Sequence, residues 1–229
     1  MKTTIETTTL SAQLAVVFEQ LVRQRRATPH FSDEPVPAHI LDEAFTLAAQ
    51  APSGYNLQPW RFLTLRTAES RAALRRAAYD QTKITEAPVV IIAFATRSGW
   101  KSTADEILHE KFQRLGLGEA GVEKIKQMAF QFVASLTEPV WLNRQTMIAF
   151  TYLMLAIESL GWDTAPMEGF DSMAVKSTFS LPDDTDVVAL LAVGRALEPK
   201  TPYPGRLAIS QFVFDERYGK PWRKSSDES

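Results

Sequence analysis

The chain has 229 residues, of which 45% are apolar and 23% are charged, and its formal net charge is −2. Such a chain is long enough to bury the core of one globular domain, and its near-neutral charge gives no electrostatic reason to expect nucleic acid or an anionic membrane as a partner. It contains no cysteine, which excludes a disulfide, a thiolate nucleophile and a cysteine-ligated metal centre.

The N-terminal sequence predicts neither a signal peptide nor a membrane anchor. Residues 1–13 are too polar for a signal peptide. The most apolar window, residues 147–157, is interrupted by Thr151 and Tyr152 and is shorter than the roughly 18 residues that cross a membrane. We therefore expect a cytoplasmic protein, with the threonine-rich residues 1–10 as a loose arm.

Helical and strand patterns alternate in the first half of the chain. Ser11 is expected to cap a helix with apolar side chains at helical spacing, and this helix ends in the basic residues 23–26. A second amphipathic helix is expected over residues 38–51, a strand over residues 60–65 and a polar helix over residues 67–78.

The second half contains the most apolar segments. Residues 88–96 and 187–194 are expected to be buried strands because almost all of their side chains are apolar. Thr103 with Glu106 has the pattern of a capping box that opens a helix. The remaining expected elements are helices over residues 122–136 and 138–160, a short helix capped by Asp171, and a weak strand over residues 211–214.

The chain lacks the common motifs of self-sufficient catalysis. Its histidines, His30, His39 and His109, are not at metal-ligand spacing, so no metal is expected. No nucleophile elbow, Walker loop or dinucleotide fingerprint is present. The interleaved helices and strands indicate a single α/β or α+β domain, in which a cofactor is expected to supply any chemistry.

Two segments are candidates for binding such a cofactor. Residues 25–31 (RRATPHF) begin with two guanidinium groups that suit a phosphate, although a solvated basic helix end has the same composition. Residues 51–60 (APSGYNLQPW) form a loop in which Gly54 permits close backbone approach, and Asn56 and Gln58 offer donors and acceptors to a heterocycle. The alternative is a loop whose amides satisfy only its own backbone.

Together, these segments resemble the FMN-dependent nitroreductase family. That family carries an R-R-S-x-R-x-F stretch followed by a P-S-x-x-N-x-Q-P-W loop. The resemblance spans residues 14–222 and includes four further segments in the family's order: QTKITEAP at 81–88, PMEGFD at 166–171, GRL at 205–207 and YGKPW at 218–222.

The resemblance implies the fold and the assembly. It implies an α+β domain over residues 1–229, built as three α/β/α layers with a mixed central sheet. Residues 97–136 are the expected helical lid over the flavin, with Phe112, Phe130, Phe132 and Trp141 as candidate lid side chains. The homodimer is expected to use the apolar helix 138–160 as its interface and to exchange the C-terminal extension, residues 199–229.

The resemblance also implies the cofactor site. Arg25 and Arg206 are expected to hold the FMN phosphate, and the backbone of Arg26 and Ala27 to contact the flavin. Gln81 and Lys83 are assigned to the ribityl chain and the N1–O2 edge, and the backbone of Glu168 and Gly169 to N5 and O4. The other subunit is expected to supply Pro52, Ser53, Gly54 and Asn56.

Two positions depart from the family pattern. Ala27 replaces its usual serine, and Pro29 replaces its second basic residue and cannot donate a backbone hydrogen bond. The charge lost at Pro29 is either missing or supplied by His30 or Lys200.

The activity that the resemblance implies is a ping-pong transfer of electrons from NADH or NADPH, through FMN, to a nitroaromatic or quinone acceptor. Three alternatives stay open. The first is a flavoenzyme of the same fold with specialised chemistry, such as reductive dehalogenation or substrate oxidation. The second is a flavin-binding protein without turnover, and the third is a ligand-binding protein without flavin.

Overall fold

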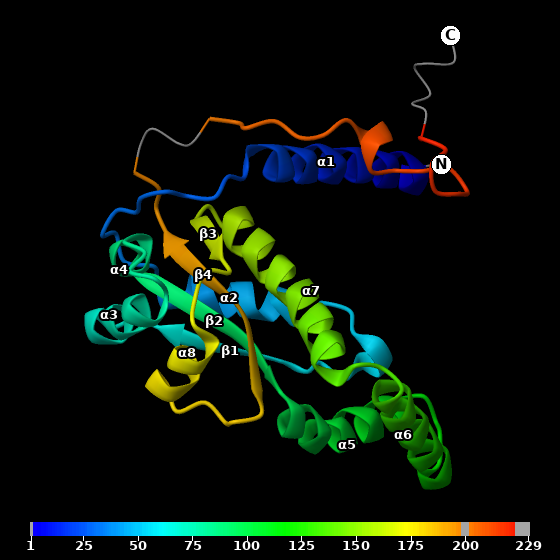
Figure 1. Ribbon diagram of the computed structural model, residues 1–229. Coiled ribbons are helices and arrows are strands. Elements are labelled where there is room, and N and C mark those ends of the chain that lie inside the picture. The colour runs from blue at the N-terminus through cyan, green and yellow to red at the C-terminus, as the bar shows by residue number, and fades with distance from the viewer. Residues whose placement is uncertain (1, 198–201, 223–229) are drawn as a thin grey trace.

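The computed structural model describes residues 2–197 and 202–222 and is built around a four-stranded sheet (Figure 1). The strands are β1 (Trp60–Leu65), β2 (Val89–Thr96), β3 (Asp163–Met167) and β4 (Thr185–Gly194), in the order β1-β2-β4-β3. All three neighbouring pairs are antiparallel. The α+β class is confirmed, but within the described residues the expected mixed sheet is antiparallel, with a single parallel bridge between Ala27 and Thr164 beside it.

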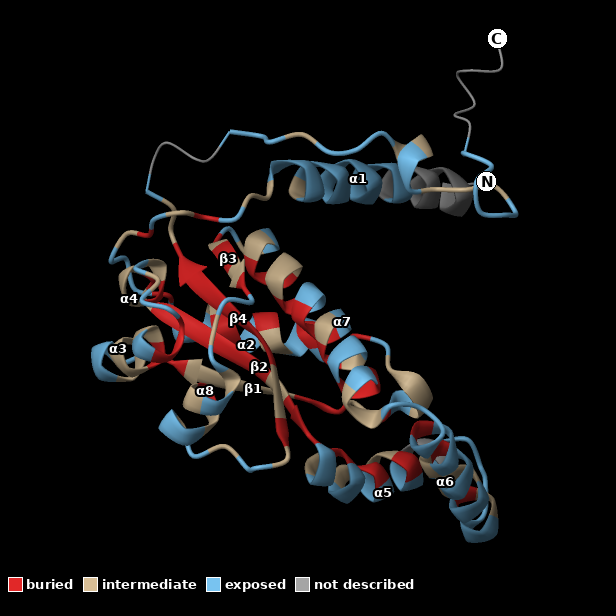
Figure 2. Cartoon of the chain, viewed as in Figure 1, coloured by how far each residue is buried: buried red, intermediate tan, exposed pale blue. Residues whose placement is uncertain are grey.

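Helices cover both faces of this sheet. On one face lie α2 (Ala38–Ala48) and α7 (Glu138–Ser159), and on the other α3 (Ala68–Ala77), α4 (Lys83–Glu86) and α8 (Ser172–Thr178). Successive residues of β2 enter the two cores in alternation, as the period of a strand requires: Val89 and Ile91 pack with α2 and α7, and Val90 and Ile92 pack on the opposite face. Figure 2 shows the buried strands between the two helical layers.

A helical hairpin extends from the end of β2. It consists of α5 (Arg97–Arg114) and α6 (Glu119–Ala134), and it lies apart from the sheet in Figure 1. Helix α5 begins before the predicted capping box because the Thr96 hydroxyl accepts a hydrogen bond from the Gly99 backbone at 3.1 Å. Thr103 is therefore inside the helix, where its hydroxyl donates to the carbonyl of Gly99. The expected start at Thr103 is wrong.

Helix α1 (Lys2–Gln24) lies beside the described C-terminal residues 202–222, away from the sheet (Figure 1). It begins at Lys2, so the predicted loose arm and the Ser11 cap are wrong for residues 2–10, where the threonine-rich sequence continues the helix. Residues 11–20 are all exposed (Figure 2). The exposed apolar side chains of α1 are Leu14, Val16, Val17, Phe18 and Val22.

The fourth strand lies elsewhere than predicted. Residues 209–211 form a short 3-10 helix, and Phe214 forms an isolated bridge with Pro221 rather than a strand of the sheet. The fourth strand is β3, which contains Pro166. Proline is tolerated there because β3 is an edge strand, where a missing backbone donor costs no ladder bond. Within the described residues, no helix is long and apolar enough to cross a membrane.

Candidate functional site

Arginines from the two ends of the chain meet in one cavity. Arg25 and Arg26 follow α1, and Arg206 lies in the C-terminal segment; we call these three residues the basic cluster. The cavity has a volume of about 440 Å³ and is also lined by Val22, Arg23 and Tyr203. Among these, Arg23 is already paired with Glu19, at 2.7 Å between Nε and Oε1. The structure thus brings together Arg25 and Arg206, as the sequence predicted.

Arg25 has a buried donor that the described residues leave unpaired. Its Nη1 atom is inaccessible to solvent and has no hydrogen-bond partner among them. A buried unpaired donor costs about 1–3 kcal/mol, and a bound anion would remove that cost by supplying an acceptor. The basic cluster therefore fits a phosphate group.

A half-buried carboxyl group lies near Arg25. Glu158, near the end of α7, accepts hydrogen bonds from the backbone N–H and the hydroxyl of Thr164, at 3.0 and 2.5 Å. Burial raises the pKa of Glu158, and the hydrogen bond from Thr164 and the charge of Arg25 partly oppose that rise, whereas Asp163 adds to it. Thr164 in turn accepts from the backbone of Thr28 at 2.9 Å, so this network connects α7 to the strand-like stretch after Arg26.

Tyr203 is a member of this cavity that sequence reasoning missed. The guanidinium carbon of Arg26 lies 4.5 Å from the centre of the Tyr203 ring, and that of Arg206 lies 5.5 Å from it. Both distances are within the range of a cation–π interaction. The available signal was an aromatic residue between Pro202 and Pro204, next to the Gly-Arg pair of the family pattern.

No described residue replaces the serine hydroxyl and the positive charge that the family pattern has at the positions of Ala27 and Pro29. Ala27 is exposed and pairs with β3 only through its backbone. His30, a candidate for the charge missing at Pro29, turns instead to Glu86, with 3.1 Å between Nδ1 and the carboxylate. Lys200, the other candidate, lies outside the described residues.

A second group of predicted residues gathers beyond the other end of β3. The Gln81 side-chain amide donates to the carbonyl of Gly169 at 2.7 Å. Glu168 and Gly169 are exposed, and Lys83 begins α4 half-buried, without an ion pair to any described residue. Glu168 follows β3 and is four positions after Thr164 in the sequence, which corresponds to about 13 Å along an extended chain. The strand thus runs from the basic cluster to this second group.

The loop of residues 51–59 is held by its own chain. The Gly54 backbone donates to the Gln145 side chain at 3.0 Å, and the Gln58 backbone donates to the Ser53 hydroxyl at 3.0 Å. Tyr55, Asn56 and Gln58 have positive φ values of 55°, 62° and 45°. Left-handed backbone at non-glycine residues is costly and is common where a surface must be shaped for a ligand.

This loop lies far from the basic cluster of the same chain. It contacts α7 at Trp141 and Gln145, near the start of that helix, whereas Arg25 adjoins Glu158 near its end. Gln145 and Glu158 are thirteen residues apart in α7, or about 20 Å along its axis. A single chain therefore does not bring Pro52, Ser53, Gly54 and Asn56 together with Arg25 and Arg206.

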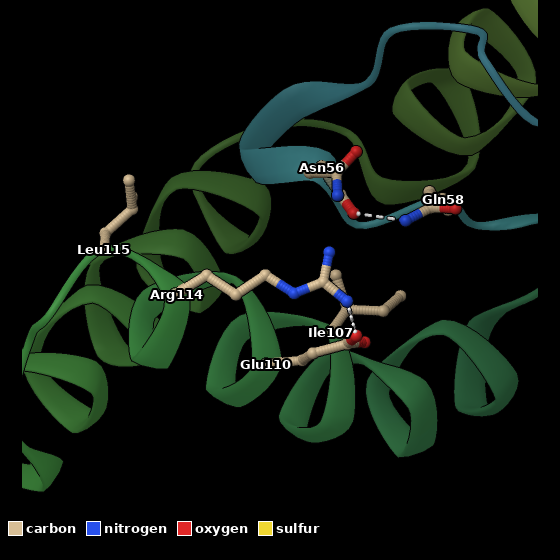
Figure 3. A pocket seen from close by; sticks show the side chains of 6 residues that line it. All are labelled: Asn56, Gln58, Ile107, Glu110, Arg114 and Leu115. Carbon is tan, nitrogen blue, oxygen red and sulfur yellow. Dashed lines mark hydrogen bonds and ion pairs between the residues drawn. The ribbon is translucent and has the colours of Figure 1, made fainter.

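The loop also borders a cavity against α5. This cavity has a volume of about 350 Å³. Figure 3 shows Asn56 and Gln58 on one side of it and Arg114, ion-paired with Glu110, on the other. The sequence predicted a lid over residues 97–136 but singled out none of the lid residues that line this cavity. The remaining lining residues are Ile107 and Leu115.

The candidate lid aromatics divide into core and surface residues. Trp141 is buried, and Phe130, half-buried, packs with it around Trp100. These residues serve the core of the hairpin. Phe132 is 42% exposed and lies 5.8 Å from Tyr55, centre to centre, so it alone of these three faces the loop and solvent together. The side chain of Phe112 lies outside those described.

The model of the nitroreductase family matches residues 22–195. The chain belongs to this family. It is 34% identical to a Thermus thermophilus protein named NADH dehydrogenase, over 83% of this chain and 92% of that protein. It is 29% identical to Bacillus subtilis MhqN, whose name describes an NAD(P)H nitroreductase, over 86% of this chain and 97% of that one.

Solved structures agree in fold. That of Bacillus subtilis nitroreductase ydfN superposes with a TM-score of 0.80 at 29% identity and covers 86% of this chain and 97% of its own. A nitroreductase from Exiguobacterium sibiricum, solved in complex with FMN, superposes with a TM-score of 0.75 at 24% identity and covers 86% and 95%. These likenesses confirm the nitroreductase-like α+β fold.

Proposed function

We propose that this nitroreductase-family chain is an FMN-dependent oxidoreductase that transfers electrons from NADH or NADPH to a nitroaromatic or quinone acceptor. The observation that carries the proposal is the buried, unpaired Nη1 of Arg25 in a cavity that it shares with Arg206. A phosphate monoester, which carries close to two negative charges, is the ligand that such guanidinium groups bind best. The names of the relatives and the FMN in the Exiguobacterium structure support the same function.

The described residues suggest how the chain would hold FMN. Arg25 and Arg206 would bind the phosphate, and the backbone of Arg26 and Ala27 would lie beside it. Gln81, Lys83, Glu168 and Gly169, beyond the far end of β3, would hold the ribityl chain and the pyrimidine edge. When bound, FMN supplies a redox centre that accepts a hydride from a reduced nicotinamide and delivers two electrons to an acceptor.

The protein's own contribution is orientation and electrostatics. The Lys83 ammonium group, without an ion pair among the described residues, would favour negative charge at the pyrimidine edge. The Glu168 and Gly169 backbone would orient the ring without titrating. Donor and acceptor would bind at the same site in turn, which would give ping-pong kinetics.

We further propose that the working form is a homodimer. Leu14, Val17 and Phe18 of α1 are 61%, 63% and 59% exposed in the single chain, and apolar surface of this kind marks an interface. The adjacent C-terminal segment, residues 202–222, exposes Leu207 and Phe212 in the same way. Both segments would pack against the second chain, and the C-terminal extension would be exchanged between the subunits.

Helix α7 would contribute less to that interface than its composition suggests. Much of its apolar surface is buried in the core, including Leu142, Leu153 and Ile157. The large apolar side chains that it leaves exposed are Val140, Ile148 and Tyr152. In the dimer, Pro52, Ser53, Gly54 and Asn56 of one chain would pack on the flavin held by the basic cluster of the other.

An absorption spectrum with and without NADH or NADPH tests the proposed function. The full-length protein should carry one FMN per chain, and heat should release FMN rather than FAD because the basic cluster offers ligands for one phosphate. Anaerobic addition of the nicotinamide should bleach the flavin, and a quinone should restore its colour. A protein that takes up no flavin after reconstitution, or whose flavin no nicotinamide bleaches, would overturn the proposal.

One alternative has specific support. The chain is 26% identical to an iodotyrosine deiodinase from Thermotoga neapolitana, over 84% of this chain and 95% of that protein. Reductive dehalogenation uses the same cofactor site, so the acceptor decides between the two activities. Turnover of a halophenol with release of halide, but no turnover of nitroaromatics or quinones, would favour the alternative.

A further inference from the structure

Tyr203 occupies an unusual position in the cavity of the basic cluster. Four arginines line this cavity, and among the described residues only Arg23 forms an ion pair with a carboxylate, that of Glu19. The remaining guanidinium groups repel one another when no anion is bound. The face of an aromatic ring carries partial negative charge and attracts cations without neutralising them.

The local backbone holds Tyr203 and Arg206 in a fixed relation. Pro202 and Pro204 restrict the φ angles on both sides of Tyr203, and Gly205 turns the chain with a φ of +85°. Arg206 then donates from Nη1 to the carbonyl of Gly205 at 2.6 Å. On the other side of the cavity, Arg26 donates from Nη1 to the carbonyl groups of Arg23 and Arg25, at 2.6 and 2.7 Å.

We propose that Tyr203 is a positioning residue for phosphate recognition: its ring holds the guanidinium groups of Arg26 and Arg206 in the cavity, and so selects flavins that carry a phosphate. This inference rests on the proposed function, because it assumes that the cavity receives the FMN phosphate. The phenol oxygen is not required for the role, since the cations contact the ring. The contacts are 4.5 Å for Arg26 and 5.5 Å for Arg206.

The test compares two flavins and three variants. The full-length protein, freed of flavin, is titrated with FMN and separately with riboflavin, which has no phosphate. Tyr203→Leu removes the aromatic face, and Tyr203→Phe keeps it. Tyr218→Leu is the matched control, because Tyr218 lies in the same segment, is 90% exposed and does not line the cavity.

Tyr203→Leu should weaken FMN binding about fivefold to thirtyfold, as expected for the loss of two exposed cation–π contacts, while riboflavin binding stays within about twofold. Tyr203→Phe and Tyr218→Leu should bind both flavins like the wild type. Unchanged melting temperature and sedimentation of Tyr203→Leu establish that its fold and assembly are intact.

Two results would overturn the inference alone. Wild-type FMN affinity in Tyr203→Leu would exclude a role for the ring, and an equal loss for FMN and riboflavin would assign Tyr203 to the ring site or to the fold. If the wild-type protein binds neither flavin, the proposed function fails, and the inference fails with it.

Discussion

The basic cluster and the loop of residues 51–59 are both shaped for a ligand, but they are completed in different ways. The basic cluster leaves a buried Arg25 donor without an acceptor among the described residues. The loop satisfies its own donors through Ser53 and Gln145 and holds Tyr55, Asn56 and Gln58 at positive φ. The basic cluster thus has a donor that a bound anion would satisfy, whereas the loop forms these hydrogen bonds within its own chain.

The two regions lie far apart within one chain. About 20 Å of α7 separates the loop's contact at Gln145 from the carboxyl group of Glu158 beside Arg25. Both regions match one family site, so we infer that a second copy of the chain brings them together.

The largest effect is expected from charges placed on α1. Leu14→Glu combined with Phe18→Glu should separate the subunits, because an unpaired charge at an apolar interface is costly to bury. FMN binding should weaken by more than about a hundredfold as the loop of the second chain is lost. Sedimentation should fall from about twice 25.6 kDa to the mass of one chain.

The matched control adds the same charge to polar positions of the same helix, Gln13→Glu with Gln20→Glu. Circular dichroism monitors the fold in both variants. A wild-type chain that sediments as a monomer and still binds FMN tightly would contradict the two-chain site.

Arg206→Ala should have the next largest effect. Removing a charge-assisted hydrogen bond to a phosphate costs roughly 1.5–3 kcal/mol, which corresponds to a loss of about tenfold to a hundredfold in FMN affinity. Fluorescence titration measures it, with Arg217→Ala as an exposed control in the same segment. Unchanged affinity would show that Arg206 is not a phosphate ligand.

Lys83→Met should change the redox potential more than the affinity. The substitution keeps much of the side-chain volume and removes a positive charge that would stabilise anionic reduced flavin. About 30 mV corresponds to 1.4 kcal/mol for two electrons, so even a weak interaction should lower the midpoint potential by tens of millivolts. The potential is measured by equilibration with reference dyes under nitrogen, and an unchanged value with flavin fully bound would make Lys83 an ordinary solvated lysine.

Glu158→Gln should have the smallest effect, and it should depend on pH. Burial raises the pKa of Glu158 in the folded state, so the stability that this group contributes is present below its unfolded pKa and is lost as the pH rises through the folded value. The glutamine can still accept from Thr164 and does not ionise, so the melting temperature of the variant relative to wild type should rise between about pH 4 and pH 8. A difference that falls or stays constant over this range would contradict the raised pKa, and Glu43→Gln, at an exposed position of α2, is the control.

Local sequence patterns predicted most of the fold correctly. The apolar runs around Ile91 and Leu191 specified buried strands, and the Asp171 cap and the long apolar helix α7 are as expected. Two elements were predicted wrongly. The edge strand β3 was missed because it is short and contains a proline, and the start of α5 was misplaced because the helix begins at Arg97, where the Thr96 hydroxyl and not Thr103 caps it. The start of α1 was missed because threonine has weak helix propensity.

The candidate site was less accessible to sequence reasoning. The resemblance to the nitroreductase family pointed to Arg25 and Arg206, and the structure places them in one cavity. Tyr203 and Glu158 were missed because a cation–π contact and the partial burial of a carboxyl group arise only when segments distant in the sequence meet. The roles assigned to the twelve predicted site residues, the cytoplasmic location and the exchanged C-terminal extension stay predictions.

Complementation between two defective chains tests the two-chain site most directly. One chain carries Arg25→Ala and Arg206→Ala, and the other carries Pro52→Glu, which places a charge on the exposed part of the loop. Each homodimer should bind FMN weakly. The heterodimer, purified with two different tags, should contain one intact and one doubly defective site, so it should bind one FMN per dimer with wild-type affinity. A heterodimer without any tight site would contradict the account.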